Sequence, residues 1–171
     1  NKDEKSRSTV LLKGKIELQV PLGIGTLQWG TTWIDDKIIN HSGVLREETC
    51  KEIVNVCDGS SITLYDTAEG YGGGTSEKRL GRLLSRNEDC IFMTKFLPAP
   101  WRCFHADLER AVRESCRRLQ VSSIPIYLLH SPVHWLRDVE YWVEACAICH
   151  KKGLIQAMGL SNCNADQVRR A

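Results

Sequence analysis

The feature that most constrains the fold of this chain is a regular alternation of short apolar segments with longer amphipathic ones. The short segments have strand length, and we expect strands at Leu22 to Thr26, Ile62 to Asp66, Cys90 to Lys95, Ile126 to His130 and Ala157 to Ser161. The longer segments predict helices at about Arg46 to Asp58, Ser76 to Ser85, Ala106 to Leu119 and Val139 to Lys152. This serial βα pattern indicates an α/β fold with a parallel sheet covered by helices, either doubly wound or closed as a barrel.

The remaining segments suggest a simple domain organisation. A tail with a possible β-hairpin occupies residues 1–20, where Thr9 to Leu12 and Lys15 to Val20 flank Lys13 and Gly14. Residues 21–171 then form the main domain, and no low-complexity linker divides it.

Composition excludes several classes of protein. With 42% hydrophobic and 26% charged residues, the chain has the composition of an ordinary globular protein. Its net charge of +2 is too small to predict a nucleic-acid partner. It contains no apolar run near the roughly 18 residues that a membrane span requires, and its first ten residues lack the apolar core of a secretion signal.

The cysteines need separate consideration because there are eight of them. They are scattered singly through apolar-periodic segments, which favours a reducing compartment over a disulfide scaffold. One stretch, CAICH from Cys146 to His150, matches the pattern for covalent haem attachment. It lies within a predicted amphipathic helix, where Cys146 and Cys149 share the apolar face with Val139 and Trp142. A c-type haem and a redox dithiol remain alternatives, and inert core packing is the favoured interpretation.

Chemically competent side chains recur at the carboxyl ends of the predicted strands. Asp66, Lys95, His130 and Ser161 each end a different strand, and Tyr71 lies in the loop after Asp66. Any one of them alone is more often a turn or cap residue than a catalyst. Because the carboxyl ends of parallel strands meet at one edge, where ligands bind in α/β folds, their combination predicts a functional site.

A glycine run follows the tyrosine, in the segment YDTAEGYGGGTSEKRLG from Tyr65 to Gly81. It is not a phosphate-binding loop, since no Gly-Lys-Ser/Thr ending follows. We expect the glycines to present Tyr71 on a tight turn, Thr75 or Ser76 to cap the next helix, and Glu77 to lie in its first turn, where the helix dipole favours an acid.

This set of side chains suggests proton transfer. A free phenol has a pKa near about 10, so it donates a proton poorly at neutral pH unless its anion is stabilised. The ammonium of Lys95 would supply an attraction of roughly 4 kcal/mol at ~4 Å and an effective dielectric constant of about 20. Asp66 would keep Lys95 charged and placed, and His130 would orient a carbonyl oxygen. These groups cannot supply hydride, so a reductase would need a nicotinamide cofactor.

The sequence resembles the aldo-keto reductases in several consecutive motifs. They are PLGIGTLQWG (Pro21 to Gly30), the Tyr65 to Gly81 segment, FMTKF (Phe92 to Phe96), IYLLHSP (Ile126 to Pro132) and GLIQAMGLSNCNADQVRRA (Gly153 to Ala171). The resemblance covers about Thr9 to the last residue and implies a (β/α)8 TIM barrel, of which this chain holds about the first five βα units.

The same resemblance implies an activity, the NADPH-dependent interconversion of small carbonyl compounds and alcohols. It assigns the catalytic tetrad of the family to Tyr71, Asp66, Lys95 and His130. Asp66 is also expected beside the cofactor and His130 beside the substrate, and no metal ion is implied.

Further contacts follow by resemblance alone. Ser161 and Asn162 are expected to hold the nicotinamide carboxamide, Gly25 and Thr26 to border the cofactor, and Trp29 to line the substrate mouth. The finer pattern of TKFLPAPWR and RRLQVSSIPIYLLHSP is similar to plastid reductases of plants and algae, which suggests the chloroplast stroma, with the cytoplasm as the alternative.

The sequence departs from the family pattern in length. It stops after the fifth predicted strand, as NADQVRRA opens a helix, whereas a complete barrel needs about 250 residues. We therefore expect a fragment of a reductase that is monomeric when complete. The alternative is a shortened, non-catalytic half-barrel that serves as a binding or interaction module.

Overall fold

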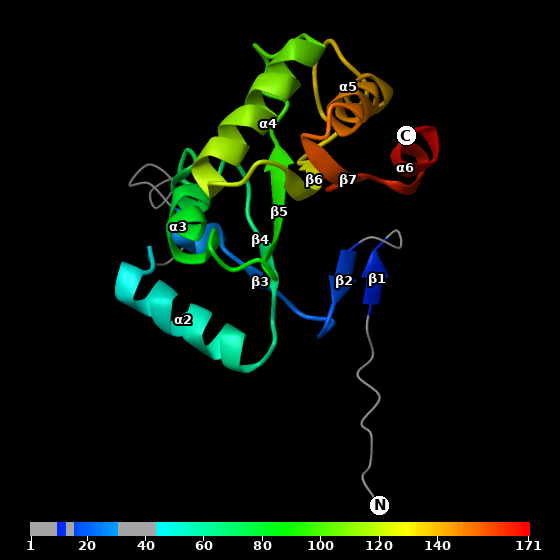
Figure 1. The fold of residues 1–171 in the computed structure, drawn as a ribbon. Coiled ribbons are helices and arrows are strands. Elements are labelled where there is room, and N and C mark those ends of the chain that lie inside the picture. Colours follow the sequence, from blue (N-terminus) through cyan, green and yellow to red (C-terminus); the bar gives the residue numbers. More distant parts are fainter. Residues whose placement is uncertain (1–9, 13–15, 31–43) are drawn as a thin grey trace, which may run out of the picture.

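The computed structural model describes residues 10–12, 16–30 and 44–171, which form two sheets and a set of helices (Figure 1). A two-stranded antiparallel sheet pairs β1 (Val10–Leu12) with β2 (Ile16–Leu18). A five-stranded parallel sheet holds its strands in chain order: β3 (Gly23–Gly25), β4 (Leu64–Asp66), β5 (Ile91–Phe96), β6 (Ile124–Leu129) and β7 (Ile155–Leu160). The expected hairpin and parallel sheet are therefore present, although the hairpin turn at Lys13 and Gly14 lies outside the described residues.

Helices connect the strands in the expected βα order. They are the 3-10 helix η1 (Leu27–Trp29) and the α-helices α2 (Glu47–Gly59), α3 (Thr75–Leu84), α4 (His105–Leu119), α5 (Val139–Lys151) and α6 (Ala165–Arg170). Strands β6 and β7 begin two residues earlier than expected, at Ile124 and Ile155, which pair with each other. Both strands also end one residue earlier than expected, so His130 and Ser161 directly follow them.

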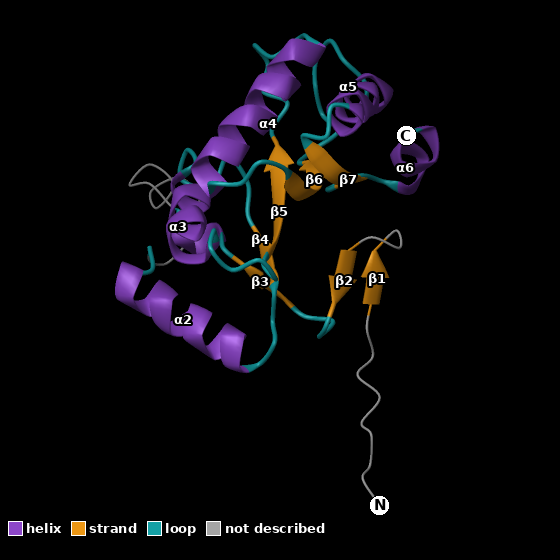
Figure 2. Cartoon of the chain, in the orientation of Figure 1, coloured by secondary structure: helices purple, strands orange, loops and turns teal. Residues whose placement is uncertain are grey.

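The hydrophobic core lies between the sheet and the helices on one of its faces (Figure 2). Alternate strand residues, among them Tyr65, Phe92 and Tyr127, are fully buried in this layer. The expected stripe on α4 faces the same core through Leu108, Val112, Ser115, Cys116 and Leu119. On the other face of the sheet Leu64, Met93 and Leu128 are only half-buried. No helix of the described residues is long and apolar enough to cross a membrane.

The CAICH stretch forms part of α5 and is divided between core and surface. Cys146 and Cys149 are buried beside Trp142, whereas His150 is exposed. Burial raises the pKa of Cys146 to about 12 and that of Cys149 to about 11, so both remain thiols at neutral pH. This placement fits core packing of the two cysteines.

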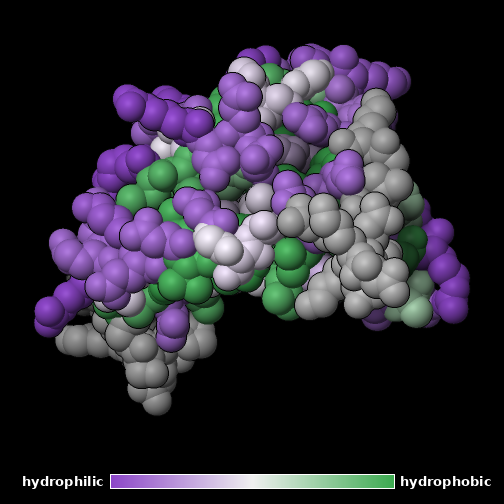
Figure 3. All heavy atoms as spheres, turned by 60° about the horizontal axis from the view of Figure 1, so that its bottom comes forward, coloured by the Kyte–Doolittle hydropathy of each residue, from purple (hydrophilic) through white to green (hydrophobic). Residues whose placement is uncertain are grey.

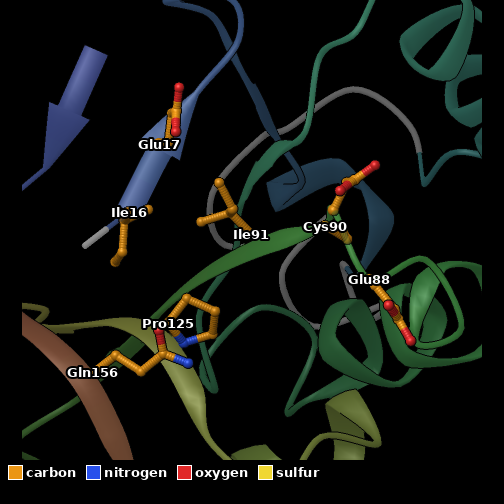
Figure 4. A pocket seen from close by; sticks show the side chains of 8 residues that line it. Ile16, Glu17, Glu88, Cys90, Ile91, Pro125 and Gln156 are labelled. Atoms are coloured by element: carbon orange, nitrogen blue, oxygen red, sulfur yellow. The ribbon is translucent and has the colours of Figure 1, made fainter. Parts of the chain in front are cut away.

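A cavity of about 280 Å³ lies at the end of the sheet where the strands begin (Figure 4). It is lined by Ile16, Glu17, Glu88, Asp89, Cys90, Ile91, Pro125 and Gln156. Burial, helped by the charge of Asp58, raises the pKa of Cys90 to about 12, so its sulfur is a poor nucleophile. When this end of the molecule is turned forward, hydrophobic side chains reach the surface among hydrophilic ones (Figure 3). Among the described residues, no group of three or more His, Cys, Asp or Glu side chains could hold a metal ion here.

Helices α3 and α4 approach each other closely at Gly81. A Cβ atom at Gly81 would lie 2.3 Å from the carbonyl oxygen of Arg118, which is backbone and cannot move aside cheaply. The glycine is therefore a requirement of helix packing.

We predict that Gly81→Ala lowers the free energy of unfolding by about 1 to 3 kcal/mol, because it over-packs this contact. The matched control is Gly59→Ala at the end of α2, where an added Cβ would meet nothing within 4 Å. Denaturant unfolding of the complete protein measures both. Equal stability of the two variants would contradict the packing argument.

Candidate active site

The carboxyl edge of the parallel sheet brings the four expected tetrad residues together. Asp66 is the last residue of β4, Lys95 is the penultimate residue of β5, and His130 follows β6. Tyr71 reaches the same edge from the loop between β4 and α3. The parallel register produces this grouping, because it aligns the strand ends.

Lys95 is the centre of the site. Its residue is only 5% exposed, and its Nζ forms an ion pair with the Asp66 carboxylate. The same Nζ donates to the backbone oxygen of Thr67 at 2.7 Å and to the hydroxyl of Tyr71 at 3.4 Å. A buried ammonium needs such partners, since an unpaired charge in the interior costs several kcal/mol. The arrangement holds a cation next to the phenol oxygen.

The backbone after Tyr71 adopts a conformation that only glycine accommodates well. Gly72, Gly73 and Gly74 have φ values of 59°, 59° and 89°. At Gly72 an added Cβ would lie 1.0 Å from the carbonyl oxygen of Gly30. The glycine run thus presents Tyr71 on a tight turn, as the sequence predicts.

The start of α3 differs from the expectation. The N-cap residue is Gly74, and it makes no side-chain capping bond, so the prediction of Thr75 or Ser76 as the cap is wrong. The hydroxyl of Thr75 instead donates to the Gly72 oxygen at 2.8 Å. The hydroxyl of Ser76 points into the buried interior, where it donates to the Thr26 oxygen at 2.9 Å. The Ser76 hydroxyl thus has a partner 50 residues away, and the Thr75 hydroxyl has a local one in the preceding turn, so neither caps the helix.

His130, which directly follows β6, lies beside Tyr71. Its ring meets that of Tyr71 edge-on, with centroids 5.8 Å apart at an angle of 80°. Burial, followed by the positive charge of Lys95, lowers the pKa of His130 from its usual value. Within the described part of the chain, its buried Nδ1 atom has no hydrogen-bond partner. The lowered pKa favours a neutral imidazole beside Tyr71.

The residues expected to hold a nicotinamide ring lie along the same edge. Ser161 follows β7, and Asn162 donates its side-chain NH2 to the His130 carbonyl oxygen at 2.7 Å. Asn162 adopts a left-handed φ of 56°, and Gly25 ends β3 in open space, where an added Cβ would meet nothing within 4 Å. A serine hydroxyl and the amide oxygen of an asparagine are suitable partners for a carboxamide, so the donor set fits this group.

Two of the residues expected to contact ligands have buried side chains. Trp29 is 1% exposed and packs edge-on against Tyr65 in the core. Thr26 is fully buried, and its hydroxyl bonds to the Asp66 carbonyl oxygen and the Ser76 hydroxyl. Its side chain therefore supports the end of β4. The sequence places both residues near the site but cannot show which way their side chains point.

The structure adds residues that sequence reasoning missed. Glu69 forms a bidentate ion pair with Arg102, which links the loop after β4 to the loop after β5. Thr67 contributes its carbonyl oxygen to Lys95. Their only sequence signal is their position just after a predicted strand, and a backbone oxygen carries no side-chain signature.

These features define a class of protein, an α/β fold of the barrel type with a tyrosine, a lysine, an aspartate and a histidine at the carboxyl edge of its parallel strands. The model of the Aldo/keto reductase family matches residues 21–171. The chain belongs to this family.

Known relatives agree with this assignment. The chain is 27% identical over 162 residues to a chloroplastic pyridoxal reductase of Arabidopsis thaliana, covering 86% of this chain and 43% of the relative. It is 35% identical over 153 residues to an uncharacterized oxidoreductase of Mycobacterium bovis, covering 88% of this chain and 44% of the relative. The chain thus spans less than half the length of these relatives.

Solved structures show the same fold. A thermostable aldo-keto reductase crystallised with the inhibitor epalrestat superimposes with a TM-score of 0.77 at 28% identity, over 95% of this chain and 57% of that one. An aldo-keto reductase of Klebsiella pneumoniae, crystallised with NADPH, gives a TM-score of 0.68 at 25% identity, over 86% and 47%. The five-stranded sheet corresponds to part of the (β/α)8 barrel of the family.

The lowered pKa of His130 predicts a pH dependence of stability. The unfolded chain binds a proton at this residue below about pH 6.5, whereas the folded protein resists it, so the free energy of unfolding falls as the pH drops below that value. We expect His130→Gln to lose less stability than the parent between pH 7 and the lower pKa, measured by denaturant unfolding. The control His150→Gln alters an exposed residue and should follow the parent. If the stability of His130→Gln falls with pH as steeply as that of the parent, His130 is not the source of this pH dependence.

Proposed function

We propose that this chain carries the catalytic centre of an NADPH-dependent reductase that interconverts carbonyl compounds and alcohols, with Tyr71 as the general acid. One observation carries the proposal. The Tyr71 hydroxyl lies 3.4 Å from the Nζ of a buried lysine that is itself paired with Asp66. A cation this close to the phenol oxygen can stabilise the negative charge that develops on it when the proton is transferred to a substrate.

Each side chain then has a separate task. Tyr71 donates its proton to the developing alkoxide of the substrate, and Lys95 stabilises the phenolate left behind. Asp66 and the Thr67 oxygen hold the ammonium in place. The neutral His130 can hydrogen-bond the substrate oxygen and so orient the carbonyl toward the phenol.

The cofactor proposal rests on the carboxyl edge and on the relatives. NADPH supplies the hydride that these side chains cannot provide. Ser161 and Asn162 would hold its carboxamide, and the open space at Gly25 would leave room beside Asp66. The NADPH in the Klebsiella pneumoniae relative supports this choice.

We further propose that the chain acts within a complete, monomeric eight-stranded barrel. Among the described residues, β3 and β7 each pair on one side only, and the inner face of the sheet stays half-buried. Three more βα units would pair both edges and cover that face. The chloroplastic relative favours the plastid stroma as the location.

The first test of the proposed function is the removal of the phenol proton. In the complete protein, Tyr71→Phe should lower the kcat of carbonyl reduction by at least about 10²-fold, because general acid catalysis contributes this much. The Kd for NADPH, measured by fluorescence titration, should stay within about twofold, because the phenol acts on the substrate oxygen. Undiminished turnover would overturn the proposed role of Tyr71.

The second test removes the cation. We expect Lys95→Met to lower kcat and to move the pH profile of alcohol oxidation to higher pH, since oxidation needs the phenolate and the ammonium favours it. Lys78→Met, an exposed lysine on α3, is the control and should keep the parent profile. If the Lys95→Met profile stays at the parent pH, Lys95 serves only the structure of the site.

A further inference from the structure

A second buried ion pair lies beneath the glycine turn. Glu77, in the first turn of α3, is fully buried, and its carboxylate accepts from Arg118 Nε at 2.5 Å and from Thr94 Oγ1 at 2.6 Å. The side chain of Arg118, from the last turn of α4, is only 13% exposed. Removing two charges from water is costly, and a well-packed apolar pair would often serve stability as well. Stability alone therefore gives a weak reason for this pair.

The arginine contacts the turn that carries Tyr71. A Cβ atom at Gly74 would lie 2.6 Å from Arg118 Cδ, so the arm of the arginine packs directly against this glycine. The amide of Ser76 donates to the Tyr71 carbonyl oxygen at 3.3 Å, which ties the tyrosine backbone to the start of α3. The position of Tyr71 therefore depends on where α3 begins, and the Glu77 to Arg118 pair holds that point.

The same network also reaches the lysine. Thr94, which donates to Glu77, directly precedes Lys95 in β5. Ser76 accepts from the Thr67 hydroxyl at 2.9 Å, and the carbonyl oxygen of Thr67 is a partner of Lys95 Nζ. Both members of the Tyr71 and Lys95 pair are thus linked to the first turn of α3.

We propose that Glu77 and Arg118 are positioning residues, which hold the Tyr71 hydroxyl beside the Lys95 ammonium by anchoring the glycine turn and the end of β5 to one buried ion pair. This inference rests on the proposed function, because it assigns a purpose to the geometry of the tyrosine acid. It predicts that damage to the ion pair harms proton transfer more than it harms ligand binding. A small displacement at a reacting group can cost about 10²-fold in rate.

The kinetic experiment uses the complete protein with Glu77→Gln and Arg118→Met. Each should lower the kcat of carbonyl reduction by about tenfold or more and move the pH profile of alcohol oxidation to higher pH, while KM and the Kd for NADPH change little. The matched control is Arg117→Met, because Arg117 is the neighbouring arginine on α4, is exposed, and pairs with Glu114. It should keep the parent kcat and pH profile. Normal kcat and pH profiles in both folded test variants would overturn the inference.

A second measurement does not depend on activity. In protein labelled with ¹³C at the tyrosine ring, the signal of Tyr71 is identified by its loss in Tyr71→Phe. Glu77→Gln and Arg118→Met should shift this signal, while that of Tyr141 on α5 stays in place, and Arg117→Met should shift neither. An unmoved Tyr71 signal would show that the ion pair serves packing only.

The two readouts separate the inference from the proposed function. If the parent protein reduces no carbonyl compound while the Tyr71 signal still moves in both variants, the proposed function is wrong and the positioning stands. If charge removal at Glu77 prevents folding, Thr94→Val tests the same link, since it removes one hydroxyl and keeps the side-chain shape. The Tyr71 signal of Thr94→Val should shift in the same direction as that of Arg118→Met. An unmoved signal together with a normal kcat would overturn the inference.

Discussion

The arrangement of the strand ends in this protein depends on a buried ammonium group, which needs an ion pair and hydrogen-bond acceptors inside the molecule. Lys95 is almost entirely removed from water, so its Nζ must find compensating partners. It finds them in the Asp66 carboxylate, the Thr67 carbonyl oxygen and the Tyr71 hydroxyl. The carboxyl ends of β4 and β5 and the loop between β4 and α3 are thereby drawn to one point. The interactions that stabilise the lysine also place its ammonium next to the Tyr71 hydroxyl.

Around this centre the polar interior is organised in two layers. The outer layer faces the open edge of the sheet and contains the lysine with its partners and His130. The inner layer lies between α3, α4 and the strands, and contains the hydroxyls of Thr26, Thr67 and Ser76 with the Glu77 to Arg118 pair. Each inner group is bonded to another, as buried polar groups must be. The inner layer is therefore rigid support for the outer one.

The parallel sheet explains why a partial barrel can still hold a recognisable site. Each βα unit contributes its reactive side chain at its own strand end, and neighbouring units align these ends through local pairing. The tetrad comes from β4, β5, β6 and one loop, so five strands suffice to bring it together. Closure of the sheet concerns other properties, namely the pairing of the two edges and the burial of its inner face.

The sequence by itself determined the order of strands and helices, the parallel sheet, the positions of Asp66, Lys95 and His130 at or beside strand ends and the need for glycine after Tyr71. These follow from local periodicity, chain direction and backbone sterics, which act over a few residues. Only the tertiary structure decided that Trp29 and the Thr26 hydroxyl face the interior, that Ser76 is not a helix cap, and that Glu77 pairs with Arg118. The direction of a side chain depends on partners distant in sequence, here 41 residues away for that pair, and no local pattern records them.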